Sequence, residues 1–134
     1  MKTTVLLGCV FFILLSCGKS ENPGNRKRFQ NTTFIHLLYP TENECMAAQT
    51  DPDFFINCHQ QLDFINDHEA HIMLTDIVWN GTYKIEGNEI VLTFENAYEI
   101  PEGEIRFVIL SPSRLLNKNE GSVWNKMHGN SIWH

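Results

Sequence analysis

Four cysteine thiols carry the most distinctive chemistry in this chain of 134 residues. Cys9 and Cys17 lie near the N-terminus, whereas Cys45 and Cys58 lie further along the chain, with twelve residues between them. A thiolate is a nucleophile that can be alkylated, can attack a substrate, or can be oxidised to a disulfide. Which of these reactions applies depends on the compartment in which each cysteine resides, and the N-terminal residues predict that compartment.

The N-terminal residues have the pattern of a secretory signal peptide. Lys2 gives a positive start, residues 5–15 are almost uninterruptedly apolar, and small residues follow. A short positive region, an apolar core and a small-residue cleavage site define such a signal. At 1.5 Å per residue the apolar core spans roughly 18 Å, well short of the ~30 Å hydrocarbon layer. We therefore expect cleavage rather than a permanent transmembrane helix.

Residues 14–17, Leu-Leu-Ser-Cys, resemble the lipobox of bacterial lipoproteins. The resemblance implies cleavage before Cys17, attachment of a diacylglycerol to its thiol and acylation of the new amine. Two or more acyl chains anchor a protein firmly, whereas a single chain binds only marginally. Residues 6–9 fit the same pattern, but cleavage there would leave an apolar segment exposed. Gly18 follows Cys17, and resemblance to Gram-negative lipoproteins then favours the outer membrane over the inner one.

Export would place Cys45 and Cys58 in an oxidising compartment, where disulfides persist. We predict a disulfide between them, which contributes roughly 3 kcal/mol in the chain-entropy model for a loop of this size. Two buried free thiols are the alternative. If the pair is oxidised and Cys17 is lipidated, the mature chain has no cysteine left to act as a nucleophile.

The remaining reactive side chains do not form a recognisable catalytic motif. Residues 67–71, Asp-His-Glu-Ala-His, superficially resemble the zinc motif His-Glu-x-x-His, but the histidines are three apart and fall on a predicted hairpin. The zinc motif requires a helix to bring both imidazoles to one face. A polar turn is the preferred interpretation, with a weak surface metal site as the alternative. The sequence also lacks a nucleophile elbow, a phosphate-binding loop and a dinucleotide fingerprint. We predict no enzymatic activity, no cofactor and no metal.

The charge of the mature chain excludes one class of partner. Removing the signal leaves nine Lys and Arg against sixteen Asp and Glu, a formal charge of −7. Nucleic-acid binding requires clustered Lys and Arg. The basic cluster at residues 26–28 lies close to the predicted anchor, where it is solvated or touches anionic headgroups. We therefore predict no nucleic-acid partner.

The chain divides into four predicted parts. After the signal at residues 1–16 comes a flexible tether at 17–31, which is polar and contains Pro and Gly. Residues 32–128 form a single β domain, and residues 129–134 form a loose tail. About 118 mature residues are enough for one core and not for two.

The domain is predicted to be mainly β. Alternating apolar residues favour an antiparallel meander of about six to seven strands, which forms a curved sheet or a small barrel. One short helix is predicted near residues 41–49, with Thr41 as its N-cap. A hairpin with a loop at residues 67–69 is predicted to pair Phe64 with Ile72.

The clearest hairpin signal is the Gly87-Asn88 pair between two apolar strands. A two-residue loop that begins with Gly is typical of a type II′ turn. This loop pairs Ile85 with Ile90 and Tyr83 with Leu92 on one face of the sheet.

Residues 81–94, followed by Phe107, Leu115 and residues 121–126 with Trp124, resemble small lipocalin-like envelope lipoproteins. The resemblance covers roughly half the chain and implies a curved antiparallel sheet or a small lipocalin-like barrel. The chain lacks the early Gly-x-Trp motif of full-sized lipocalins and has fewer predicted strands than their eight. These departures argue against a deep internal cavity.

Several aromatic side chains of this region either fill the core or line an apolar pocket. Trp79 precedes Asn-Gly at a strand junction, a location that is consistent with the rim of a pocket. The predicted pocket residues are Trp79, Tyr83, Phe94, Phe107 and Trp124.

The sequence therefore predicts a lipid-anchored protein of the cell envelope, most simply at the outer membrane, that binds a ligand without catalysis. Its partners are the membrane, through lipidated Cys17, and either a small apolar ligand or another envelope protein. An inhibitor or immunity-type protein is one alternative. A secreted eukaryotic lipocalin-type protein is the other, because Asn31 and Asn80 begin glycosylation triplets.

Overall fold

The computed structural model describes residues 28–94 and 103–133, and these contain eight strands and one short helix. The predicted signal peptide, Cys17 and most of the predicted tether lie outside the described residues. The elements, in chain order, are β1 (Thr32–Leu37), α2 (Glu42–Ala48), β2 (His59–Phe64), β3 (Glu69–Met73), β4 (Val78–Glu86), β5 (Glu89–Thr93), β6 (Glu104–Ser111), β7 (Arg114–Asn117) and β8 (Val123–Lys126).

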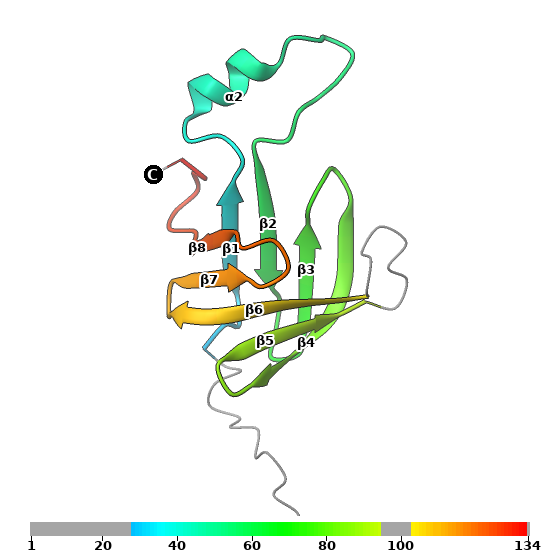
Figure 1. Cartoon of the computed structure of the whole chain (residues 1–134), viewed down its shortest axis with the longest axis vertical. Helices are drawn as coiled ribbons and strands as arrows, with labels where there is room; N and C mark the ends of the chain where they lie inside the picture. The colour runs from blue at the N-terminus through cyan, green and yellow to red at the C-terminus, as the bar shows by residue number, and fades with distance from the viewer. Residues whose placement is uncertain (1–27, 95–102, 134) are drawn as a thin grey trace, which may run out of the picture.

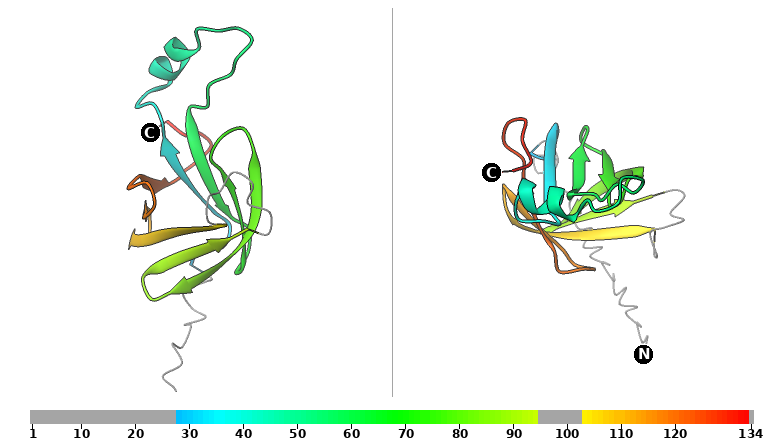
Figure 2. Two further views of the ribbon diagram at one scale, coloured as in Figure 1. Left: turned by 45° about the vertical axis from the view of Figure 1, so that its right-hand side comes forward. Right: turned by 90° about the horizontal axis from the view of Figure 1, so that it is seen from above.

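The eight described strands form a closed antiparallel barrel (Figures 1 and 2). Each strand pairs with the next along the chain, and β8 pairs with β1, with Phe34 opposite Lys126, to complete the circle. A closed barrel leaves no sheet edge unpaired. The mainly β class with one short helix is confirmed, but the expected six to seven strands are too few.

Strand β7 is the clearest element that the sequence analysis did not predict. It has four residues, and its inward positions are Leu115 and the polar Asn117. Asn117 is 2% exposed, and its Oδ1 accepts a hydrogen bond of 2.9 Å from the Asn119 backbone N–H. An asparagine that bonds its own backbone two residues on is typical of turns. The local sequence therefore indicated only a turn, whereas in the structure Asn117 both ends strand β7 and begins the following turn.

Aromatic rings fill the interior of the barrel. Phe64 contacts Tyr83 at a centroid distance of 4.8 Å, and Phe107 contacts Trp124 at 5.3 Å, both edge to face. Such pairs are preferred over face-to-face stacking and add to the energy of burial. The core therefore consists of packed side chains along the barrel axis.

Phe29 belongs to this core although it precedes β1. Its side chain is 1% exposed, and its ring lies 5.3 Å from that of Phe64 and 6.0 Å from that of Phe34. The sequence analysis placed this residue in the flexible tether, because polar neighbours surround it. Burial of a phenylalanine moves the start of the folded domain from residue 32 to before Phe29.

The Gly87-Asn88 hairpin has the predicted register. Ile85 lies opposite Ile90 and Tyr83 opposite Leu92. Gly87 has a φ of 66°, and Asn88 has no positive φ, which fits a type II′ turn. The predicted register is therefore confirmed. It could be predicted from sequence because the glycine at the first loop position determines the turn type.

The register predicted for the β2–β3 hairpin is wrong by two residues. Phe64 pairs with Ala70, and Ile72 pairs with Leu62. Asn66 shifts the turn toward the N-terminus, because its Oδ1 accepts the backbone N–H groups of His68 at 3.0 Å and Glu69 at 2.8 Å. A shift of two preserves which side chains face inward.

Helix α2 and the following loop lie outside the barrel, beyond the end of β1 (Figure 1). The Thr41 hydroxyl accepts the Glu44 backbone N–H at 3.3 Å, so the predicted N-cap is confirmed. The predicted disulfide is also present, with Cys45 and Cys58 Cα atoms 5.6 Å apart. Helix α2, the one helix in the described residues, is not long and apolar enough to span a bilayer.

Candidate functional site

A hollow of about 640 Å³ lies beside β4, between the β2–β3 turn and the end of β5. Its size falls within the range of roughly 300–1,000 Å³ that is usual for small-molecule sites. The described residues that line it are His68, Glu69, Val78, Trp79, Asn80, Gly81, Thr82, Thr93 and Phe94.

Gly81 shapes the floor of this hollow. Along β4 the buried side chains are Tyr83 and Ile85, and Gly81 continues this inward-facing series without a side chain. A Cβ at Gly81 would lie 2.8 Å from Phe94 Cδ1 and 2.7 Å from the Thr93 carbonyl oxygen. The Phe94 ring therefore occupies the space that a side chain would take. The strand sequence requires glycine here so that Phe94 can pack against the β4 backbone.

Two further apolar side chains extend this floor. Trp79 is half-buried, packs against the core and lies opposite Ile72 of β3. The neighbouring Val78 also lines the hollow and is 54% exposed. Together with Phe94 they form the apolar part of a lining whose other side chains are polar, and this part favours the apolar portion of a ligand.

Glu69 provides a carboxylate at the rim. Its Oε2 accepts a hydrogen bond of 3.0 Å from Asn66 Nδ2, and its Oε1 lies 3.5 Å from His71 Nε2. The turn that holds Glu69 is itself fixed by Asn66, whose carbonyl oxygen accepts a hydrogen bond of 2.9 Å from the Tyr83 hydroxyl. An apolar floor with a positioned polar group at its edge is the usual construction of a binding pocket.

The structure separates the five predicted pocket residues into two groups. Trp79 and Phe94 line the hollow. Tyr83, Phe107 and Trp124 lie in the barrel core, at 4% exposure or less, away from the hollow. All five side chains are aromatic, so their residue types alone did not distinguish those that line the hollow from those that fill the core.

Sequence reasoning missed Glu69 and Gly81 as parts of the site. Gly81 had a usable signal, because a glycine that interrupts an alternating strand often marks the close approach of another group. No comparable sequence signal marked Glu69, because its position depends on the turn that Asn66 stabilises. A correct register for the β2–β3 hairpin would have been needed to place it.

The motif at residues 67–71 forms the β2–β3 turn and the start of β3. His68 Nδ1 lies 2.9 Å from Asp67 Oδ1, and both side chains are largely exposed. In the described residues, no three His, Cys, Asp or Glu side chains gather in a way that could hold a metal ion. Two residues of this polar turn, Glu69 and His68, also line the hollow.

A separate cluster of charged side chains lies on β5, on β6 and in the turn after β7. Arg106 Nε lies 2.6 Å from Glu104 Oε1, and Lys118 Nζ lies 2.7 Å from Glu89 Oε1. The hydrogen bond from Lys118 lowers the pKa of Glu89, with Arg106 adding to the effect and burial opposing it. The hydrogen bond to Glu104 raises the pKa of Arg106, so both shifts favour the charged form of the group. These pairs link β5, β6 and the turn after β7 on the barrel surface, where ion pairs contribute little to stability.

Comparisons with known proteins give no assignment: no family model, no curated protein and no solved structure matches this chain.

Proposed function

We propose that this chain is a lipid-anchored, non-enzymatic binding protein of the bacterial cell envelope, with a lipocalin-like barrel that takes a small, mainly apolar ligand. The anchor is Cys17, at the outer membrane. The ligand site is the hollow beside β4, where Trp79 and Phe94 form the floor.

The support for the anchor comes from the sequence. A signal peptide of the right length ends on a lipobox-like tetrapeptide, and two or three acyl chains on Cys17 would hold the protein at a bilayer. Ten residues separate Cys17 from Arg28, where the described chain begins. A segment of that length, if flexible, spans on average about 15–20 Å, enough to hold a small barrel clear of the headgroups.

The observation that carries the ligand proposal is the contrast between a filled interior and an open hollow. Eight-stranded carriers often hold their ligand along the barrel axis. Here aromatic rings occupy that axis, with Phe107 and Trp124 fully buried. In the described residues the hollow next to β4 is lined by Trp79, Phe94 and Val78. A volume of about 640 Å³ limits that guest to a small molecule.

A binding role suits this lining better than a catalytic one. Among the described residues that line the hollow, none is cysteine, serine or lysine. Glu69 and His68 are the titratable side chains at the rim, and they come from one exposed turn. General acid–base catalysis needs the reacting group held in place within reach of the substrate, whereas the side chain of His68 is 64% exposed.

Native mass spectrometry of the full mature protein, released from detergent micelles in the gas phase, tests the ligand proposal. We expect a retained small molecule on the wild-type protein and its loss in Val78→Asp, because a carboxylate in the apolar floor repels an apolar guest. Leu110→Asp is the matched control, since Leu110 is 49% exposed and lies on β6 outside the hollow. A wild-type spectrum without an adduct, or an adduct equally retained by Val78→Asp, would refute the ligand site.

A further inference from the structure

Residues 38–58 form a segment that stands off the barrel, and we call it the protrusion. It leaves the barrel after β1 and returns at the start of β2. Figures 1 and 2 show helix α2 and its loop extending beyond the barrel end, whereas β1 begins at the other end. The described chain therefore enters at one end of the barrel and presents the protrusion at the opposite end.

The protrusion exposes large apolar side chains. Phe55 is 89% exposed, its neighbour Phe54 is 67% exposed, and Met46 on α2 is 62% exposed. Single exposed apolar residues are ordinary on a protein surface, but two adjacent, largely exposed phenylalanines are not explained by the folding of the barrel. Buried aromatic anchors contribute much of the energy of protein interfaces.

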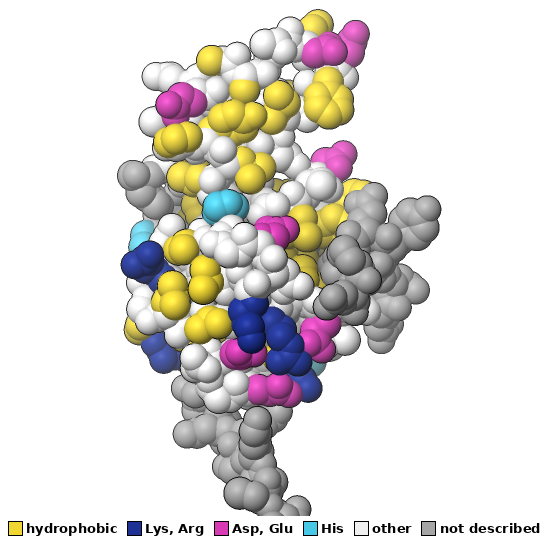
Figure 3. Space-filling view, in the orientation of Figure 1, with side chains coloured by type: hydrophobic (Ala, Val, Ile, Leu, Met, Phe, Trp, Pro, Cys, Tyr) yellow, Lys and Arg dark blue, Asp and Glu magenta, His cyan; other side chains and the backbone are white. Residues whose placement is uncertain are grey.

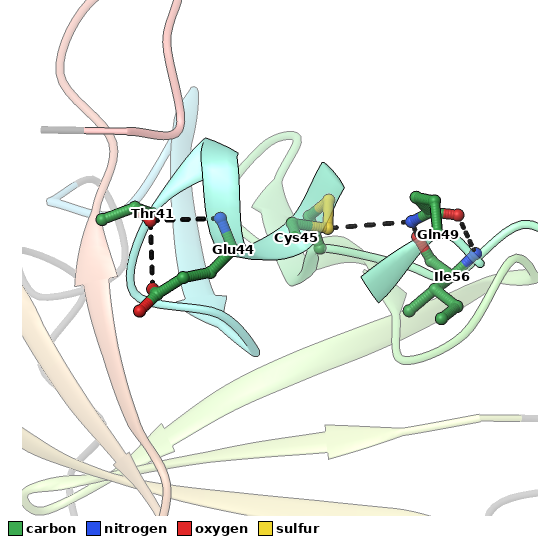
Figure 4. The surroundings of a disulfide bond; sticks show 6 residues. Thr41, Glu44, Cys45, Gln49 and Ile56 are labelled. Atoms are coloured by element: carbon green, nitrogen blue, oxygen red, sulfur yellow. Dashed lines mark hydrogen bonds between the residues drawn. A yellow bond between two sulfur atoms is a disulfide. The ribbon is translucent and has the colours of Figure 1, made fainter. Parts of the chain in front are cut away.

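The loop that carries these rings is held in place from both sides. The Gln49 side chain donates to the Ile56 carbonyl oxygen at 2.7 Å and accepts the Ile56 backbone N–H at 2.9 Å. The disulfide ties α2, through Cys45, to Cys58 at the base of the protrusion. Figure 4 shows Gln49 directed at the Ile56 backbone close to the disulfide. Phe54 and Phe55 are thus presented on an ordered loop, which reduces the entropy lost on binding.

The charge of the protrusion is entirely negative. It contains Glu42, Glu44, Asp51 and Asp53 and no Lys or Arg. None of these four carboxylates forms an ion pair with another described residue. Figure 3 shows acidic and hydrophobic side chains over the protrusion, while the Lys and Arg side chains in view lie over the barrel. A surface of this kind attracts positive charge and repels negative charge.

We propose that the protrusion docks on a cationic protein, with Phe54 and Phe55 entering an apolar pocket of that protein and the four carboxylates facing its Lys or Arg side chains. The proposal is independent of the hollow beside β4. An anionic membrane surface is disfavoured, because four carboxylates approach it without a compensating cation. Docking of the protrusion on that of a second copy is disfavoured for the same reason, since both carry the same charge.

Site-specific photo-crosslinking in the protein's own cells tests the proposal. The full chain carries p-benzoylphenylalanine in place of Phe55 or, as a control on β6, in place of Leu110, which is also exposed. We expect a crosslink from position 55, and not from position 110, to one protein whose sequence has a net positive charge. Crosslinks to lipid, to a second copy of this chain or to an acidic protein overturn the proposal, as does no crosslink.

The identified partner is then purified, and its affinity for the full chain is measured. We expect Phe55→Ser to weaken binding at least tenfold and Leu110→Ser to leave it unchanged. Asp51→Asn together with Asp53→Asn is expected to slow association several-fold, and added salt should reduce the difference between this variant and the wild type. Circular dichroism verifies that each variant is folded. An affinity unchanged by Phe55→Ser, or association insensitive to both charge and salt, contradicts the proposed contact.

Discussion

Substitution of Gly81 by alanine tests the packing that forms the floor of the hollow. The added Cβ would lie 2.7 Å from the Thr93 carbonyl oxygen and 2.8 Å from Phe94 Cδ1, both shorter than real Cβ contacts. The ring of Phe94 can turn aside, but the Thr93 oxygen belongs to the β5 backbone, which pairs with β4 at Thr82. Relief of the contact therefore requires the two strands to separate locally.

The expected cost follows from two opposing effects. Overpacking of a well-packed site costs about 1–3 kcal/mol. Replacing glycine by alanine also restricts the unfolded chain, which returns about 0.4–1 kcal/mol. Taking the middle of each range, the free energy of unfolding of Gly81→Ala should thus fall by about 1–2 kcal/mol. With a urea slope of about 2 kcal/mol/M, the unfolding midpoint should fall by about 0.5–1 M.

Gly121 provides the control that separates crowding from backbone strain. It has a φ of 74° and open space around its Cα, so the cost of substitution there comes from the backbone dihedral. Asparagine tolerates this conformation better than alanine, so Gly121→Asn should be more stable than Gly121→Ala. At Gly81 the order should reverse, because asparagine is larger. Equal or greater stability of Gly81→Ala relative to wild type would refute the reasoning about the contact between Phe94 and β4.

Three further outcomes are expected. Phe29→Ala should lower the free energy of unfolding by about 3–5 kcal/mol in urea titrations, because the ring is part of the core, whereas a residue in a flexible tether would have no effect. Replacing Cys45 and Cys58 by serine removes a restraint of about 3 kcal/mol on residues 38–58, so amide hydrogen exchange should quicken there while the barrel strands keep their protection; equal acceleration in the strands would contradict this. In NMR titrations Glu89 should have a pKa below its ordinary value, and Lys118→Met should raise it. The stability that Glu89 contributes is present above the ordinary glutamate pKa and is lost as the pH falls through its folded-state pKa; an unchanged Glu89 midpoint in Lys118→Met would contradict the assignment.

The parts of the fold that sequence predicted well depend on local chemistry. Gly87 determines a turn type, and the turn type determines the register of β4 and β5, so that hairpin was predictable from a few residues. The cap at Thr41 is local in the same sense. The position of the β2–β3 turn was less predictable, because Asn66 competes for backbone N–H groups that alternation of apolar residues does not reveal.

Closure of the barrel was not predictable from any one segment. It depends on β1 meeting β8, two strands separated by most of the domain, and on the four-residue strand β7 between them. The separation of the aromatic residues into those of the core and those of the hollow also depends on contacts between strands that are distant in sequence. Phe107 and Trp124 are buried because strands distant in sequence surround them, whereas Trp79 lies near a barrel surface that only the closed sheet defines.

The intact mass of the mature protein, isolated from its own cells, tests the central claim most directly. The account predicts a polypeptide that begins at Cys17 and carries a diacylglycerol with one further acyl chain. A mass that corresponds to an unmodified polypeptide would contradict the anchor. Sugar on Asn31 or Asn80 would contradict the bacterial envelope assignment as well, and would indicate a secreted eukaryotic protein instead.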